Sequence, residues 1–223
     1  MSIRNCALML ALCVLFLSLG KPVAGLAQQV AQHDASGFRK LVPVQPTESP
    51  GKIEVTEFFS YGCPHCNEFY PLLKTWLARQ PRDVVLLRVP VGFNRPPWEN
   101  LQRAYYALQA TGDLAKLDGP LFEAIHDQHR QLFDPRSLAD WVGAHGGNAE
   151  KFTAAYTSFG VNNQTVQADR MAESYAVEGI PTMAVNGEYL AQGDTLAQIL
   201  DNTDKLIARV RAERAATTPA AKH

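Results

Sequence analysis

A strand–helix–strand pattern between residues 53 and 89 constrains the fold more than any other feature of this 223-residue chain. Residues 53–59 form a strand candidate, and apolar residues then recur at helical spacing from Pro64 to about Arg79. Residues 84–89 are almost continuously apolar, which is typical of a strand buried on both faces. Two such strands joined by a helix lie parallel with a right-handed crossover, so the pattern predicts an α/β fold.

The rest of the chain divides into segments with different predicted secondary structure. Residues 28–50 are polar and interrupted by prolines, which indicates an irregular lead-in, whereas residues 96–164 show successive helix candidates and no strand pattern. Further on, Asn186-Gly187 is the strongest short turn signal, and it predicts a hairpin over 182–191. A last amphipathic helix follows, and we expect residues 214–223 to be a flexible tail.

The N-terminus, residues 1–27, is predicted to be a cleaved signal peptide. Arg4 precedes an uncharged apolar stretch at 6–19, and Gly25 and Ala27 fit the small residues required before a cleavage site. The apolar stretch is too short to span a membrane comfortably. We therefore expect the protein to be exported.

Export would change both the number of cysteines in the mature protein and the redox environment around them. Cleavage after Ala27 would remove Cys6 and Cys13 and leave Cys63 and Cys66 as the only cysteines. That pair would enter a compartment in which disulfides form. The formal charge of the whole chain is −1, which argues against a nucleic-acid partner because phosphate binding requires a basic surface.

The sequence Cys63-Pro64-His65-Cys66 lies where a parallel sheet places its reactive groups, just after the first predicted strand. Pro64 suits a first helical turn, and the unpaired N–H groups of that turn stabilise an anion. Cys63 should therefore ionise more readily than an ordinary thiol, and a cationic His65 would add to this. We assign Cys63 as the nucleophile and Cys66 as the buried resolving thiol. A stabilised thiolate favours the reduced protein, so its disulfide should be a strong oxidant.

The segments "EFFSYGCPHC" (57–66) and "VEGIPTMAVNGEY" (177–189) together resemble the DsbA family of bacterial thiol:disulfide interchange proteins. This resemblance implies a thioredoxin-like fold interrupted by an inserted all-helical domain. On that reading, 28–95 and 165–213 form the thioredoxin-like domain and 96–164 form the insertion.

The resemblance also implies a function. A protein of this family gives its disulfide, here Cys63–Cys66, to newly exported unfolded proteins in the periplasm of a Gram-negative bacterium. The transfer passes through a mixed disulfide, and a DsbB-like, quinone-linked membrane oxidase then reoxidises the protein. We expect no cofactor beyond the redox-active disulfide, no metal, and a monomer.

Four more residues take roles from the resemblance. Pro181 is expected to be cis and to pack beside the disulfide, exposing the Ile180 backbone to an extended substrate. Isoleucine before this proline favours an oxidase over an isomerase. Glu57 lies on the apolar face of its strand, and Arg88 on the next strand matches a basic partner. Their role stays open between a proton relay for Cys66 and a structural ion pair.

Other readings remain possible at this point. A tetrahedral zinc ion could be bound by four residues, Cys63, Cys66, His126 and His129. However, about 60 residues separate the cysteines from the histidines, whereas zinc fingers have a compact spacing. A purely structural disulfide would close a very short loop and stabilise weakly. Within redox chemistry, isomerase and reductase activities remain open, but residues 28–50 are too short for a dimerisation domain.

Overall fold

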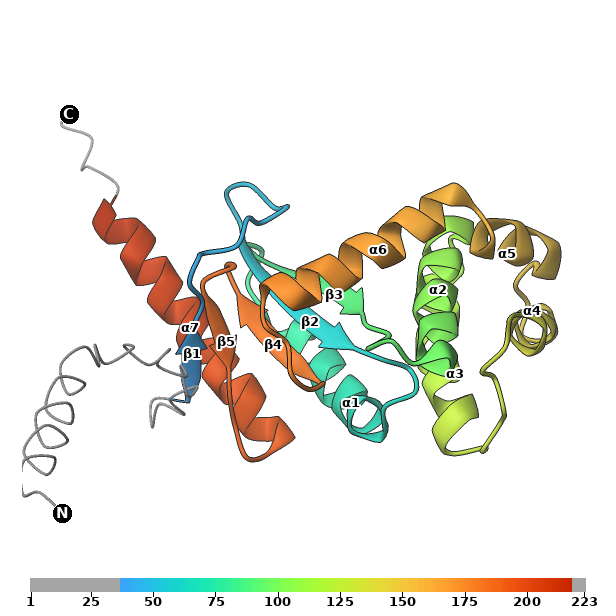
Figure 1. Ribbon diagram of the computed structural model, residues 1–223. Coiled ribbons are helices and arrows are strands. Elements are labelled where there is room, and N and C mark those ends of the chain that lie inside the picture. The colour runs from blue at the N-terminus through green and yellow to red at the C-terminus, as the bar shows by residue number, and fades with distance from the viewer. Residues whose placement is uncertain (1–36, 218–223) are drawn as a thin grey trace, which may run out of the picture. The chain divides into compact units, whose positions relative to one another are not determined.

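The computed structural model describes residues 37–217, and the predicted signal peptide lies outside them. Five strands form one mixed sheet in the order β1-β5-β4-β2-β3 (Figure 1). Only β2 and β3 pair in parallel, and the other pairs are antiparallel. The strands are β1 (Phe38–Lys40), β2 (Ile53–Phe59), β3 (Val84–Pro90), β4 (Thr182–Val185) and β5 (Tyr189–Ala191).

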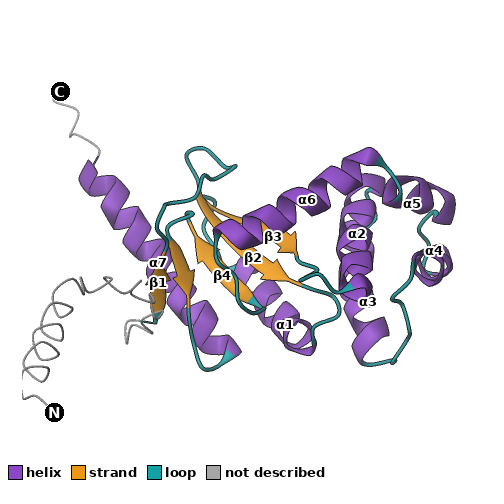
Figure 2. Ribbon diagram, viewed as in Figure 1, coloured by secondary structure: helices purple, strands orange, loops and turns teal. Residues whose placement is uncertain are grey.

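Helices cover both faces of the sheet (Figure 2). The crossover helix α1 joins β2 to β3 and shares one face with the last helix, while α6 covers the other face. The remaining helices pack on one another beside the sheet. The helices are α1 (Pro64–Ala78), α2 (Pro96–Thr111), α3 (Leu114–His126), α4 (Pro135–Ala144), α5 (Ala149–Tyr156), α6 (Phe159–Ser174) and α7 (Leu196–Thr217).

Strand parity divides the core into two parts. Ile53 and Val55 of β2 pack with Met183 in the cluster beneath α1 and α7. Phe58 points the other way and packs against Tyr175, at the end of α6, with ring centroids 5.2 Å apart. All seven residues of β2 are buried, because the strand has a neighbour on each side and helices on both faces.

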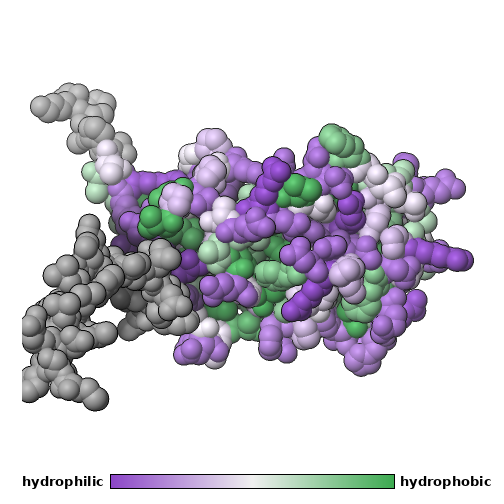
Figure 3. Space-filling view, viewed as in Figure 1, coloured by the Kyte–Doolittle hydropathy of each residue, from purple (hydrophilic) through white to green (hydrophobic). Residues whose placement is uncertain are grey.

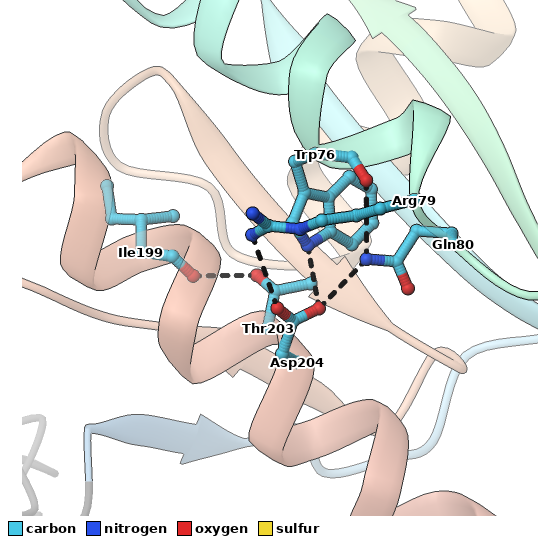
Figure 4. A network of polar contacts seen from close by, with 6 residues as sticks. All are labelled: Trp76, Arg79, Gln80, Ile199, Thr203 and Asp204. Atoms are coloured by element: carbon cyan, nitrogen blue, oxygen red, sulfur yellow. Dashed lines mark hydrogen bonds and ion pairs between the residues drawn. The ribbon is translucent and has the colours of Figure 1, made fainter.

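Trp76, near the C-terminal end of α1, anchors this helix to α7 (Figure 4). The indole Nε1 of Trp76 donates to Asp204 Oδ1 at 2.7 Å, and Gln80 Nε2 donates to the same oxygen at 3.0 Å. Arg79 adds an ion pair to Asp204 at 3.6 Å. We call Trp76, Arg79, Gln80 and Asp204 the α1–α7 cluster.

The structure confirms the strand–helix–strand unit and the hairpin, and it corrects three sequence expectations. The lead-in contains β1, whose three residues pair with β5. β3 is an edge strand, so its middle is only half-buried and not enclosed on both faces. The helix α7 runs to Thr217, and Arg214 donates to Asn186 Oδ1 at 2.6 Å, so residues 214–217 are not a loose tail.

The insertion is all-helical, as expected, but its predicted end falls inside an element. The boundary between residues 164 and 165 lies within α6, which is continuous and packs on both α2 and β3. The two parts of the fold therefore share this helix. No helix among residues 37–217 is long and apolar enough to cross a membrane. On the face drawn in Figure 3, hydrophilic side chains predominate and apolar ones surface in scattered patches.

Candidate active site

The cysteine motif lies at the N-terminal end of α1, immediately beyond β2. Cys63 is the residue before the helix, with extended backbone angles (φ −94°, ψ 119°), and Pro64 occupies the first helical position. Cys66 follows in the first turn and is completely buried. Cys63 is only 6% exposed, which makes it less accessible than its place at the start of a helix suggested. Cys63 and Cys66 are both free, with no disulfide between them.

The surroundings of Cys63 lower its pKa to about 6. The main cause is a hydrogen bond from the Cys66 thiol, and the backbone N–H groups of Cys66 and His65 also donate to the Cys63 sulfur. The charge of His65 has the same direction but contributes less, and burial opposes all of these effects. The helix-start explanation is therefore supported, but the resolving thiol itself contributes most to the stabilisation of the thiolate.

Cys66 has the opposite behaviour. Burial raises the pKa of its thiol far above the ordinary value, and the nearby Cys63 and Glu57 raise it further. Of the two sulfurs, only Cys63 is therefore expected to be a thiolate near neutral pH. This difference favours Cys63 as the attacking sulfur, and it means that Cys66 needs help to lose its proton.

Pro181 lies next to the cysteine motif, in the loop before β4. The Ile180–Pro181 peptide bond is cis, as the family resemblance implied. The Cys63 Sγ lies 3.7 Å from the carbonyl oxygen of Ile180. Ile180 and Pro181 also line a groove of about 800 Å³, together with the β5–α7 loop and the first turns of α7.

His65 points outward, with 72% of its side chain exposed. Its Nδ1 lies 3.6 Å from Glu68 Oε2, one turn further along α1. A protonated His65 would therefore share its charge between the Glu68 carboxylate and the Cys63 thiolate. Solvent screens a charge this exposed, which agrees with its small effect on the Cys63 pKa.

Glu57 and Arg88 form the ion pair that the sequence predicted. They are register partners on the parallel strands β2 and β3, and Arg88 Nε donates to Glu57 Oε2. Glu57 is 1% exposed and Arg88 is 11% exposed at the side chain. Burial raises the pKa of Glu57, and the positive charge of Arg88 opposes that rise.

A second carboxylate, which the sequence reading missed, completes this pair. Asp118 of α3 accepts from Arg88 Nη1 at 2.6 Å and from the Tyr61 hydroxyl at 2.6 Å. Asp118 occupies a buried position between Leu114 and Phe122 on the apolar side of α3. A charge among apolar residues at helical spacing was the signal available, and it is the same signal that singled out Glu57.

We call Glu57, Arg88, Asp118 and Tyr61 the carboxylate–arginine cluster. The Arg88 guanidinium stacks over the Phe59 ring, 4.0 Å from its centroid. Two buried atoms of the cluster, Glu57 Oε1 and Arg88 Nη2, have no hydrogen-bond partner among the described residues. The cluster thus retains one free acceptor and one free donor next to the cysteines.

The insertion reaches the cysteine motif at two further points. The Trp98 indole lies so close to Gly62 that a Cβ added there would be 2.7 Å from Nε1. His126 Nε2 lies 2.8 Å from the backbone oxygen of Tyr61. The loop before Cys63 is therefore held against α2 and α3 of the helical insertion.

The alternative zinc site is not formed. His126 ends α3, half-buried against Tyr61 instead of on a solvated helix face, and His129 lies beyond the helix in a loop. Among residues 37–217, no group of three or more His, Cys, Asp or Glu side chains is arranged to hold a metal ion. The physical reason is that α3 ends before His129, so the two histidines do not share a helix face.

Comparison with known proteins places this geometry in context. Residues 85–204 match the family model described as a DSBA-like thioredoxin domain. The chain is similar to thiol:disulfide interchange protein DsbA of Burkholderia cepacia, with 40% identity over 181 residues, 80% of this chain and 84% of that protein. The crystal structure of Pseudomonas aeruginosa DsbA superposes with a TM-score of 0.76 and 35% identity, covering 80% of this chain and 94% of that one. Xylella fastidiosa DsbA gives a TM-score of 0.75 and 33% identity, covering 79% and 96%.

Proposed function

Because the chain belongs to the DsbA family and is therefore a thiol:disulfide oxidoreductase, we propose that it works as an oxidase that donates the Cys63–Cys66 disulfide to reduced, unfolded exported proteins. The observation that carries the direction of the reaction is the contrast between the two thiols. The pKa of Cys63 is lowered to about 6, while that of Cys66 is strongly raised. Stabilisation of the Cys63 thiolate stabilises the reduced protein, which makes the disulfide form oxidising.

The exchange begins when a substrate thiolate attacks Cys63 of the disulfide. A bond forms between the substrate sulfur and Cys63, the Cys63–Cys66 bond breaks, and its electron pair goes to Cys66. A second substrate thiolate then attacks the substrate sulfur of the mixed disulfide. The substrate leaves with a new disulfide, and Cys63 leaves as the thiolate that its surroundings favour.

The groove beside Pro181 is the proposed binding site for the substrate chain. Its volume of about 800 Å³ suits an extended peptide, and Ile180, one of its lining residues, has its carbonyl oxygen 3.7 Å from the Cys63 sulfur. The backbone of Ile180 would pair with that peptide as a strand would. Binding through backbone groups places few demands on substrate sequence, as a general donor of disulfides requires.

Glu57 is proposed to handle the proton of Cys66. When Cys66 is released as a buried thiolate, it needs a proton at once, because burial strongly disfavours its charge. A protonated Glu57 would supply that proton, and its carboxylate would take the proton back during reoxidation. The raised pKa of Glu57 supports this exchange.

The remaining parts of the proposal follow from the family resemblance and the predicted signal peptide. The protein would act as a monomer in the periplasm and would need no cofactor other than its own disulfide. A DsbB-like, quinone-linked membrane oxidase would restore that disulfide. Cys63 would attack the partner's disulfide, and Cys66 would then close the intramolecular bond.

Equilibration with glutathione tests the direction of the reaction. The fraction of oxidised protein is measured against the ratio of reduced to oxidised glutathione, and an oxidase requires that even mildly reducing mixtures convert it to the dithiol. A disulfide that persists under strongly reducing mixtures would contradict the oxidase role. In a matched activity assay, Cys63→Ala should abolish oxidation of a reduced, unfolded protein. Cys66→Ala should be equally inactive in this assay, because it has no disulfide to donate. When it is given a disulfide-bonded protein instead, its Cys63 thiolate should attack that disulfide and accumulate as the mixed disulfide.

A further inference from the structure

Asp118 connects the helical insertion to the redox centre, and neither the cysteine motif nor its cis-proline loop includes it. It comes from α3, yet it contacts Arg88 on the edge strand of the sheet and Tyr61 in the loop before Cys63. Its side chain is 12% exposed. A carboxylate this buried is retained only where its charge and its oxygens are matched by partners.

The cluster contains two carboxylates but only one cation. Arg88 donates through Nε to Glu57 and through Nη1 to Asp118, so a single guanidinium serves both acids. An arginine paired with Glu57 alone would hold that carboxylate firmly in its charged form. Each acid receives only part of the attraction when the cation is shared.

We propose that Asp118 is a positioning residue that keeps Glu57 able to exchange a proton, by drawing part of the Arg88 charge away from it. This inference rests on the proposed role of Glu57 as the proton donor to Cys66. Asp118 serves as the second counter-ion of Arg88, and the Tyr61 hydroxyl holds it in place. Glu57 then alternates between its acid form before the disulfide is attacked and its carboxylate form afterwards.

The groups around Glu57 agree with this division of roles. Among the groups that change the pKa of Glu57, Arg88 of β3 is the only cation. Arg88 lowers this pKa, and the carboxylate of Asp118 on α3 raises it. The negative charge of Glu57 in turn raises the pKa values of Cys66 and Tyr70 of α1 and of Tyr105 of α2. The pKa values of these three groups are raised, so they stay neutral near pH 7 and leave Asp118 as the charge that opposes Arg88.

The test follows the carboxylic-acid band of Glu57 by infrared spectroscopy of the reduced, full-length protein as a function of pH, with the band assigned by its loss in Glu57→Gln. Asp118→Asn keeps the shape of the side chain and removes its charge. We expect the Glu57 midpoint to fall by about one pH unit, because Arg88 then pairs with Glu57 alone. The pH profile of disulfide donation should shift in the same direction.

Asp118→Glu is the matched control, since it keeps the charge and should hold the midpoint near that of the unmodified protein. An unchanged midpoint in Asp118→Asn, or an equal shift in Asp118→Glu, overturns the inference. Should Asp118→Asn not fold, Tyr61→Phe decides the question. Loss of the hydroxyl concentrates the Asp118 charge on Arg88 and should raise the Glu57 midpoint, and any other result counts against the inference.

The proposed proton donation by Glu57 is tested separately. If Glu57→Gln leaves the pH profile of disulfide donation unchanged, Glu57 carries no proton in the reaction. The infrared midpoints would still report whether Asp118 controls the charge of Glu57. The two failures are therefore distinguishable.

Discussion

Two polar clusters join different parts of the fold, and they differ in burial and in pairing. The carboxylate–arginine cluster joins β2, β3, α3 and the loop before Cys63, whereas the α1–α7 cluster joins two helices. The carboxylate–arginine cluster is almost fully enclosed, with 1% of the Glu57 side chain exposed. In the α1–α7 cluster the ion pair lies at the protein surface, where Asp204 is 40% and Arg79 is 59% exposed at the side chain, while Trp76 is buried. Both clusters join segments that are distant in the sequence.

Pairing separates the two clusters further. The carboxylate–arginine cluster leaves Glu57 Oε1 and Arg88 Nη2 buried without partners, whereas among the described residues no buried atom of the α1–α7 cluster lacks one. A cluster whose buried atoms are all paired serves to dock one helix on another. A buried cluster with unused bonding capacity can change its protonation, so we expect function in the first and stability in the second.

We expect the largest effect from a substitution that breaks the buried carboxylate–arginine cluster. Arg88→Met removes the only cation of the cluster and leaves Glu57 and Asp118 uncompensated in the interior. We expect the free energy of unfolding to fall by about 3–5 kcal/mol, measured by urea denaturation. The matched change at the surface, Arg79→Met, should cost at most about 1 kcal/mol, because exposed ion pairs contribute little. Equal losses in the two variants would contradict the difference between the clusters.

The second prediction concerns redox state and pH. The folded-state pKa of Cys63, about 6, lies below the ordinary thiol value of 9.0, so its thiolate stabilises the reduced protein above the unfolded-state pKa and that stability is lost as the pH falls through 6. Between pH 6 and 8 the unfolding free energy of reduced protein should rise relative to oxidised protein, approaching about 1.4 kcal/mol per pH unit. Denaturant unfolding of both forms measures this, and Cys63→Ser should remove the slope.

The third prediction concerns the α1–α7 cluster. Asp204→Ala leaves the Trp76 Nε1 donor, on a side chain that is 1% exposed, without its acceptor. We expect a loss of about 1–3 kcal/mol in unfolding free energy, typical of a buried donor left unpaired. Asp204→Asn keeps an acceptor and should lose less. The glutathione equilibrium should be the same in both variants as in the unmodified protein, and a shift would mean that this cluster also acts on the disulfide.

The smallest expected effect is at His65. His65→Gln removes a charge that contributes less to the lowered pKa of Cys63 than the hydrogen bonds from Cys66 and the backbone. A thiolate absorbance titration should show a small rise in the Cys63 pKa and a slightly less oxidising disulfide. An unchanged titration midpoint would remove His65 from the tuning of Cys63. A rise to the ordinary thiol value would mean that the hydrogen bonds contribute little.

Much of the candidate site could be predicted from local sequence. Strand parity placed Glu57 on an apolar face, and the register of β2 and β3 confirms that Arg88 is its neighbour. Proline after Cys63 indicated the start of α1, and Asn186-Gly187 indicated the turn between β4 and β5. These signals are local, because they depend on side-chain periodicity and on backbone preferences of single residues.

Other features depend on contacts between distant segments, which periodicity does not encode. The three residues of β1 form a strand only because β5 offers a free edge, and α6 continues through residue 164 because both α2 and β3 support it. The same holds for the main cause of the lowered Cys63 pKa, the thiol of Cys66, whose proton is directed at the Cys63 sulfur by the packing of α1. Short elements and directed hydrogen bonds have no repeating pattern in a sequence.

The sequence by itself determined that this chain carries a cysteine pair at the start of a helix after a buried strand, because strand, turn and helix signals are local and strong. Only the tertiary structure decided how the charge beside that pair is balanced. Asp118 is 30 residues from Arg88 and 57 from Tyr61 along the chain, and they meet because α3 packs across the end of the sheet. Glu57 and Asp118 share the Arg88 guanidinium because the fold brings three distant segments together, so the spacing of these residues in the sequence does not predict it.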